Sequence, residues 1–273
     1  MKNWKHILTG LGNSTAQLVP YVLVSASIKS MIVAAFIRVF FRKPSLSAKV
    51  YSGLFVFLTT ALEILLISYP KRSFFSSELR SHAETALTFD DGPSPNITPQ
   101  ILDTLKKYNV TATFFVVADC VERHPELLRR IVAEGHQVGI HGNKHTAMIL
   151  QPGWMLSKRI EECRRAIWAA LGEEIPITLF RPPYGYRNVN THAAARRSKV
   201  AMVLWSIDSR DYMLGPPEQV AAKVLKELHP GAVILMHDGK DNTVSPDALE
   251  YILLGFENRG YTSAAMCNSG VSA

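Results

Sequence analysis

The sequence predicts an α/β fold, a barrel of about seven parallel strands, preceded by N-terminal transmembrane helices. Three observations lead to this prediction. Short apolar runs alternate with helical stretches from residue 86 onward, two long apolar stretches lie within the first eighty residues, and chemically reactive side chains follow the predicted strands. An open, doubly wound sheet is the alternative, because the region is shorter than the roughly 250 residues of a complete eight-stranded barrel.

The composition is that of a folded protein with an excess of positive charge. The chain has 273 residues, of which 47% are hydrophobic and 19% charged, so it can bury a core and is not intrinsically disordered. A net charge of +7 suits an anionic partner surface, but no DNA- or RNA-reading motif is present, which argues against nucleic acid. Three cysteines without a C-x-x-C pair argue against a cysteine zinc site and a disulfide framework.

Two long apolar stretches precede the rest of the chain. Leu18–Phe41 and Val50–Ser68 are each close to the roughly 20 residues that span a bilayer, although Lys29 and Arg38 interrupt the first. We therefore predict that residues 1–80 are a membrane anchor with one or two transmembrane helices in contact with membrane lipid. Two buried helices of a soluble protein are the alternative.

The loop between the two apolar stretches indicates the orientation of this anchor. It carries Arg42, Lys43 and Lys49, and positively charged loops remain in the cytoplasm. A helical hairpin with this loop inside places both the N-terminus and the rest of the chain outside, although Lys71 and Arg72 weigh in the other direction. We therefore predict localisation at the cell membrane, with the C-terminal domain extracytoplasmic.

The remainder of the chain alternates short apolar runs with helical stretches. The runs predict strands at Ala86–Phe89, Thr113–Val117, Gln137–Ile140, Thr178–Arg181, Ala201–Trp205, Ala232–Met236 and Tyr261–Ala265. Helices are expected between them, including Leu156–Leu171, whose apolar residues recur every three or four positions, and Pro216–Leu228. Strands that alternate with helices imply parallel βαβ units, and hence the predicted barrel.

Side chains able to do chemistry come at the ends of these predicted strands. In chain order they are Asp90, Asp91, His141, His145, Arg181, Asp208, Asp211 and His237. The carboxyl ends of the strands share one face of a parallel barrel, which is where active sites lie. These residues are therefore expected to converge, although the first and the last are far apart in the sequence.

The first of these residues suggest a metal centre. Two histidines four positions apart, His141 and His145, together with the carboxylate of Asp91, leave open positions on a zinc or similar divalent ion, as catalytic sites do. The neighbouring Asp90 would point in another direction and could take a proton from a metal-bound water, while Arg181 keeps it ionised. Structural histidines and an ordinary Asp-Asp-Gly-Pro turn are the alternative.

His237 and its neighbours suggest the second half of an amide hydrolysis. A protonated His237 could give its proton to a leaving nitrogen, and Asp211 could orient it and raise its pKa. The backbone N–H near Tyr184, together with the metal, could hold the oxyanion. A base and an acid on opposite sides of a metal-bound water are the arrangement expected for amide hydrolysis.

Five short motifs resemble those of a known family. They are Thr88-Phe89-Asp90-Asp91-Gly92-Pro93, His141-Gly142-Asn143-Lys144-His145, Arg181-Pro182-Pro183-Tyr184, Asp208-Ser209-Arg210-Asp211-Tyr212 and Leu235-Met236-His237. In this order they resemble the signatures of the polysaccharide deacetylase family, also called the NodB-homology or carbohydrate esterase 4 family. The resemblance covers residues 85–239 and indicates that residues 85–273 form the catalytic domain.

The resemblance implies a distorted (β/α) barrel, a divalent metal and a role for each of these residues. The metal would be zinc in most relatives, with cobalt or another divalent ion as alternatives. The roles are Asp91, His141 and His145 as metal ligands, Asp90 as base, Arg181 as its partner, His237 as acid with Asp211 beside it, and Pro183, Tyr184, Tyr212 and Leu235 as substrate or oxyanion residues. Gly142 and Tyr212 depart from the family, which usually has Ser or Thr and Trp at these positions.

These expectations define a membrane-anchored, metal-dependent hydrolase that removes N-acetyl groups from N-acetylglucosamine-containing glycans such as chitooligosaccharides or peptidoglycan. In that reaction a metal-bound water attacks the acetamide, with Asp90 as base and His237 as acid. Three alternatives stay open: an O-acetyl esterase acting on an acetylated polysaccharide, a membrane-anchored glycan-binding protein without activity, and a membrane structural protein. The sequence names neither the glycan nor the oligomeric state.

Overall fold

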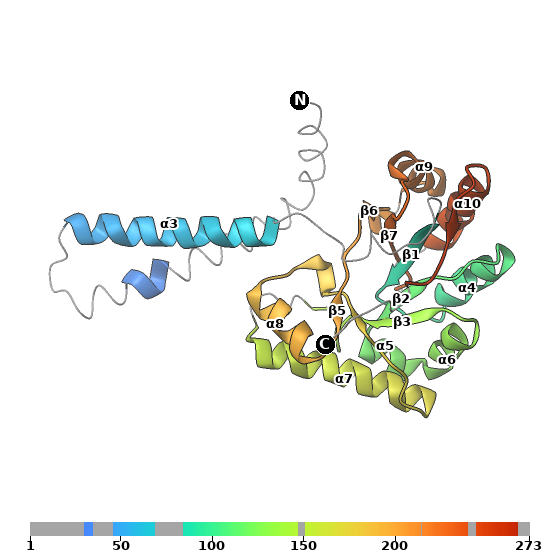
Figure 1. The fold of residues 1–273 in the computed structure, drawn as a ribbon, viewed down its shortest axis with the longest axis horizontal. Helices are drawn as coiled ribbons and strands as arrows, with labels where there is room; N and C mark the ends of the chain where they lie inside the picture. Colours follow the sequence, from blue (N-terminus) through green and yellow to red (C-terminus); the bar gives the residue numbers. More distant parts are fainter. Residues whose placement is uncertain are drawn as a thin grey trace. The chain divides into compact units, whose positions relative to one another are not determined.

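The computed structural model describes residues 30–34, 46–68, 84–146, 151–213, 215–239 and 244–266. The chain divides into two compact units, Met1–Tyr69 and Pro70–Ala273 (Figure 1).

The first unit contains the helix α3 (Leu46–Ser68), which includes the predicted span Val50–Ser68. Within the described residues, no helix combines the length and apolar character needed to cross a membrane. The other predicted span, Leu18–Phe41, lies outside the described residues except for a short helical piece at 30–34.

The second unit is built around one parallel sheet. Its strands are β1 (Glu84–Asp90), β2 (Thr113–Val116), β3 (Gln137–Ile140), β4 (Leu179–Phe180), β5 (Ala201–Met202), β6 (Ile207–Asp208), β7 (Val233–His237) and β8 (Thr262–Ser263). They are ordered β5-β4-β3-β2-β1-β7-β6, and β8 pairs with the beginning of β1. Almost every residue of β1, β2 and β7 is buried, so these strands form the centre of the core.

The sheet curls into a half-barrel, an incomplete form of the predicted barrel. β5 lies at one end of the sheet and β6 at the other, yet only residues 203–206 connect them. The Val203 N–H donates to the Phe180 carbonyl on the β4 side at 2.8 Å, and the Ser206 N–H donates to the Val233 carbonyl on the β7 side at 2.9 Å. Five Cα–Cα steps reach at most about 19 Å, so the two ends of the sheet approach each other without pairing in the described residues.

One predicted strand is shorter than expected. The run Ala201–Trp205 was expected to form a single strand, but only Ala201–Met202 pairs with β4, and the chain then crosses to β7, where it forms β6. β5 ends where its pairing with β4 ends, and β6 begins where the chain reaches β7. The apolar run does not mark either point. The other six predicted strands each coincide with an observed strand to within a few residues.

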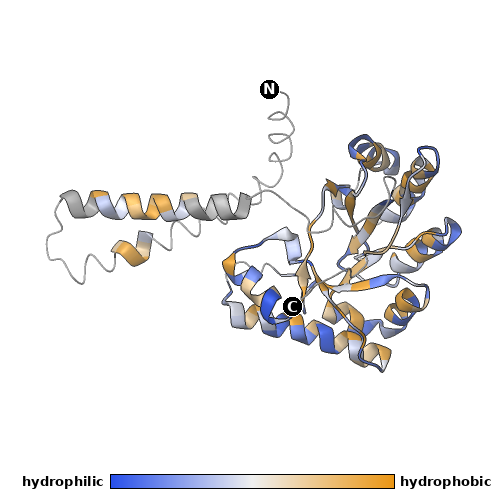
Figure 2. Ribbon diagram, in the orientation of Figure 1, coloured by the Kyte–Doolittle hydropathy of each residue, from blue (hydrophilic) through white to orange (hydrophobic). Residues whose placement is uncertain are grey.

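Helices connect the strands of the second unit. They are α4 (Thr98–Lys107), α5 (Ala118–Arg123), α6 (Pro125–Ala133), α7 (Gly153–Leu171), α8 (Val189–Arg197), α9 (Pro217–Glu227) and α10 (Ser245–Glu257), with 3-10 turns η1 (Pro183–Gly185) and η2 (Asp211–Met213). The predicted helix Leu156–Leu171 is α7, which ends at Gly172 with a φ of 77°, and the predicted helix Pro216–Leu228 is α9. In Figure 2 these helices carry both hydrophilic and hydrophobic residues, as amphipathic helices packed on a core do.

Candidate metal and catalytic site

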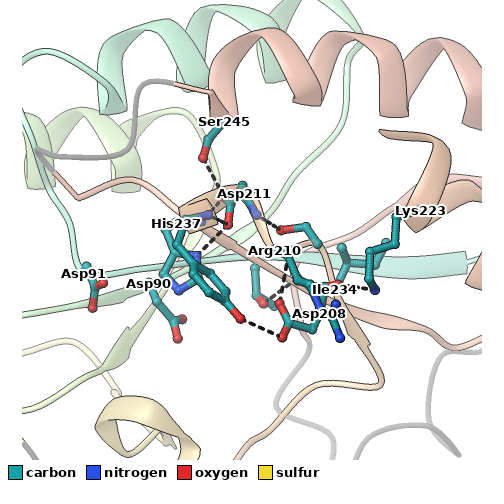
Figure 3. A network of polar contacts seen from close by, with 12 residues as sticks. Asp90, Asp91, Asp208, Arg210, Asp211, Lys223, Ile234, His237 and Ser245 are labelled. Atoms are coloured by element: carbon teal, nitrogen blue, oxygen red, sulfur yellow. Dashed lines mark hydrogen bonds and ion pairs between the residues drawn. The ribbon is translucent and has the colours of Figure 1, made fainter. Parts of the chain in front are cut away.

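The carboxyl ends of the strands carry the chemically reactive residues. Asp90 and His237 are the last residues of β1 and β7 and lie opposite each other in the ladder. Asp91 follows β1, His141 follows β3 and Arg181 follows β4, and all of these strands are parallel. Figure 3 shows Asp90 and Asp91 beside His237. The topology therefore gathers these residues at one edge of the half-barrel.

Asp91, His141 and His145 form a group, called the metal cluster below, that could hold a metal ion. The Oδ1 atom of Asp91 lies 3.3 Å from Nε2 of His141 and 3.2 Å from Nε2 of His145. Two ligand atoms about 2.1 Å from one tetrahedral zinc ion would be about 3.4 Å apart, so these separations suit a shared ion. Oδ1 of Asp91 is also buried without a hydrogen-bond partner among the described residues, which fits an atom that binds a cation.

The conformation and charge of Asp91 suit it to a metal ligand. Its φ of 78° is left-handed and turns the chain away from the direction of β1. Burial would raise the pKa of its carboxyl group, but His141 and His145 outweigh this effect and lower the pKa to about 2. The carboxylate is therefore ionised at neutral pH and available to a cation.

A loop after β3 orients both histidines of the metal cluster. Nδ1 of His141 lies 2.8 Å from the carbonyl oxygen of Arg181, and because a carbonyl only accepts, Nδ1 carries the proton and Nε2 keeps its lone pair. Gly142 has a φ of 104°, a conformation that favours glycine over the Ser or Thr of the family signature. The ring of His145 packs against Tyr184, with 4.5 Å between their centroids.

Asp90 is bound to a fully buried arginine. Nη1 of Arg181 donates to Asp90 Oδ1 at 2.7 Å and to Thr88 Oγ1 at 2.8 Å. The same guanidinium donates to two carbonyl oxygens of the connection between β5 and β6, at 3.3 and 3.2 Å, so the buried charge has several partners. The second oxygen of Asp90, Oδ2, lies 3.8 Å from Nε2 of His141 and is therefore next to the metal cluster.

Half-buried His237 and fully buried Asp211 form a second ion pair. Asp211 Oδ1 lies 2.7 Å from Nδ1 of His237, and Asp211 Oδ2 accepts hydrogen bonds from the His237 backbone N–H at 2.7 Å and from Ser245 Oγ at 2.5 Å (Figure 3). Burial opposes the charge of the imidazole, but the Asp211 carboxylate outweighs it and raises the pKa of His237 to about 9. His237 is therefore cationic at neutral pH, and the contact with Asp211 occupies Nδ1 and leaves Nε2 for another partner.

The predicted substrate and oxyanion residues differ in exposure. The ring of Tyr212 lies edge-on to His237, with centroids 5.3 Å apart, and its hydroxyl donates to Asp208 Oδ2 at 3.3 Å. Tyr184 is 46% exposed, so its ring lies at the rim of the metal cluster. Pro183 and Leu235 are buried in η1 and β7, and their predicted role toward substrate stays a prediction.

Three polar residues of this network lie outside the predicted set. Thr88 accepts from Arg181, Ser245 donates to Asp211, and Asp238 is buried beside the end of β1, where burial raises its pKa to about 7. Asp238 directly follows the predicted acid, and Thr88 opens the first motif, so both could be suspected from their positions in the sequence. Ser245, at the start of α10, gives no such signal.

The chain is similar in sequence to a family model and to known deacetylases. Residues 80–203 match the family model described as polysaccharide deacetylase. A chitooligosaccharide deacetylase of Bradyrhizobium is 35% identical over 189 residues, which cover 64% of this chain and 85% of the relative. A peptidoglycan-N-acetylglucosamine deacetylase of Listeria monocytogenes is 37% identical over 182 residues, which cover 67% of this chain but only 38% of that longer protein.

A solved structure shares the fold of the second unit. The family 4 carbohydrate esterase from Streptomyces lividans, in complex with acetate, is 30% identical with a TM-score of 0.61, over 66% of this chain and 91% of that one. The residues matched by the family model include the metal cluster and the Asp90–Arg181 pair, whereas Asp211 and His237 lie beyond them.

Zinc retention should depend on the metal cluster. His141→Ala removes one of three ligands, so the purified variant is expected to contain no bound zinc by elemental analysis, whereas the wild type retains it. His124→Ala changes a histidine outside the cluster and should leave the zinc content unchanged. Equal zinc content in His141→Ala and the wild type would contradict this site.

Proposed function

This chain belongs to the polysaccharide deacetylase family and is a hydrolase of carbon–nitrogen bonds, and we propose that it removes N-acetyl groups from N-acetylglucosamine-containing glycans. The observation that carries the proposal is the meeting of the metal cluster, the Asp90–Arg181 pair and the Asp211–His237 pair at one edge of the half-barrel. The relatives named for deacetylation of chitooligosaccharides and of peptidoglycan support this substrate class.

Asp90 is placed to accept a proton. A divalent cation such as zinc, held by the metal cluster, polarises a carbonyl oxygen and lowers the pKa of a water. Arg181 donates to Oδ1 of Asp90, while Oδ2 lies beside Nε2 of His141. Oδ2 then takes the proton of the attacking water, which makes Asp90 the general base.

His237 is placed to protonate the departing amine. Asp211 holds Nδ1 and keeps the imidazole cationic, so the opposite ring nitrogen can donate to the leaving nitrogen. In this proposal the Tyr184 backbone N–H helps to stabilise the oxyanion, and the Tyr212 ring beside His237 borders the sugar that carries the acetyl group.

Hydrolysis of an O-acetyl ester on a polysaccharide is the second candidate. The likeness to the Streptomyces lividans carbohydrate esterase favours it, and the same base, metal cluster and acid would serve an ester. A glycan-binding role without activity has less support, because every residue that the hydrolysis needs is in place.

The most direct test is acetate release from a panel of glycans. We expect release from chitooligosaccharides or peptidoglycan, its loss on treatment with a chelator, and its recovery when zinc is added back. Release from acetylxylan alone would establish the esterase instead. No release from any glycan by zinc-loaded protein would contradict an enzymatic role.

The roles of Asp90 and His237 can be distinguished by comparing amide and ester substrates, which differ in their leaving groups. A general acid or base typically contributes about 10²–10⁴-fold, so Asp90→Asn and His237→Ala should each lower kcat by roughly this factor while zinc content is unchanged. His237→Ala should slow amide substrates more than ester substrates, because an amine needs a proton to leave and an alkoxide leaves more easily. Unchanged amide hydrolysis in His237→Ala would refute its role as the acid.

The alkaline limb of kcat/KM should report the protonation of His237. Asp211 raises the pKa of His237 from 6.5 to about 9. His237 is therefore protonated at pH values below this pKa and loses its proton as the pH rises through it. The Asp211→Asn variant lacks the carboxylate that raises the pKa of His237, while burial still lowers this pKa. Its activity should therefore fall at a lower pH than that of the wild type. A bound cation lowers the pKa in both proteins, so the two profiles are compared at saturating zinc. Superimposable profiles would contradict the pairing.

We also propose that the first unit attaches the chain to a membrane, with the second unit on the extracytoplasmic side. The support comes from the two apolar stretches, the basic loop between them, and large apolar side chains of α3 that are exposed, among them Tyr51 and Phe57. Protease added to intact cells should digest the second unit and spare cytoplasmic markers. Complete protection of the second unit would contradict this orientation.

A further inference from the structure

The turn that carries Asp91 is held by a carboxylate that the proposed reaction does not use. Asp238 is 1% exposed, and its backbone N–H donates to the carbonyl oxygen of Asp90 at 2.9 Å, which extends the ladder between β1 and β7. Its side-chain Oδ2 accepts a hydrogen bond from Thr98 Oγ1 at 2.7 Å. The same hydroxyl oxygen accepts the backbone N–H of Ser94 at 2.7 Å, so the network brackets the turn on both sides of Asp91.

The carboxylate of Asp238 also fills the space beside this turn. A Cβ atom added at Gly92 would lie 2.0 Å from Oδ2 of Asp238, so the backbone of Gly92 is in direct contact with the carboxylate. A Cβ atom added at the next residue, Gly239, would lie 3.0 Å from Cβ of Asp91. The pair Asp238–Gly239 therefore contacts Asp91 and both of its neighbours in the chain.

Asp91 needs such support because its backbone is left-handed. A φ of 78° is an uncommon conformation for a residue with a side chain, and it sets the direction in which the carboxylate points. If Asp91 relaxed to the extended conformation of β1, its side chain would point elsewhere and Oδ1 would no longer lie within 3.3 Å of both histidine Nε2 atoms.

We propose that Asp238 is a positioning residue that fixes Asp91 in the orientation in which its Oδ1 faces His141 and His145. Contact with Gly92 and the hydrogen bonds to Thr98 and to the Asp90 carbonyl carry this role. The inference rests on the proposed metal-dependent function, and it assigns to Asp238 an effect on metal affinity rather than on proton transfer.

The test measures the zinc affinity of the full chain by calorimetric titration of metal-free protein, together with its melting curve. Loss of a residue that orients a metal ligand typically costs about 10–100-fold in affinity, and this loss is expected for Asp238→Ala. Asp238→Asn keeps both the acceptor for Thr98 and the volume beside Gly92, so it should recover most of the affinity. Asp247→Ala, which removes an exposed carboxylate from α10, is the charge-matched control and should bind zinc like the wild type.

A second variant keeps the test decisive if Asp238→Ala does not fold. Thr98→Val removes the hydroxyl that bridges Asp238 to Ser94 and leaves Asp238 in place, so it should weaken zinc binding and change the visible absorption spectrum of the cobalt-loaded protein. Wild-type affinity and spectrum in Thr98→Val, unchanged affinity in Asp238→Ala, or equal losses in Asp238→Ala and Asp238→Asn would each overturn the positioning role. A wild-type protein that binds no zinc would instead contradict the proposed function.

Discussion

The buried guanidinium of Arg181 is the interaction on which the geometry of the site depends. It joins β4 to β1 through Asp90 and Thr88, packs 4.1 Å from the ring centroid of Phe115 in β2, and binds the carbonyls of the short connection between β5 and β6. The carbonyl of the same residue fixes the tautomer of His141. Removing either Arg181 or Asp90 would leave the other as an uncompensated buried charge, at a cost of about 3–5 kcal/mol. The contacts of Arg181 are therefore expected to form or break together. The connection between β5 and β6 and the orientation of Asp90 are thus coupled through one side chain.

The site holds an anionic carboxylate and a cationic imidazole. Around Asp91 the facing histidines hold the pKa of the carboxylate at about 2, which suits a cation ligand. Around His237 the Asp211 carboxylate raises the pKa of the imidazole to about 9, which suits a proton donor. The pKa values of these two groups are driven apart by their own surroundings, so at neutral pH one side of the site is anionic and the other cationic.

The fold could be predicted from the sequence for most strands, but not for the crossing from β5 to β6. The central strands β1, β2 and β7 are buried along almost their whole length and are rich in apolar residues, which single them out in the sequence. β5 and β6 have two residues each, and the apolar run that contains β5 continues past its end, so nothing local marks the crossing between them. Whether the sheet closes or remains a half-barrel depends on hydrogen bonds between its two ends, which a local pattern does not contain.

By itself the sequence determined which residue types the site would use, because the order of the motifs and the spacing of His141 and His145 reflect local requirements of strand ends and tight loops. The apolar stretches at the N-terminus likewise come from the sequence alone. Only the tertiary structure decided that Asp91 adopts a left-handed backbone, that a carbonyl from a neighbouring strand end fixes His141, and that Asp238 lies against Gly92. These features arise from contacts between segments 40 or more residues apart, and such contacts exist only once parallel strands have brought their carboxyl ends together.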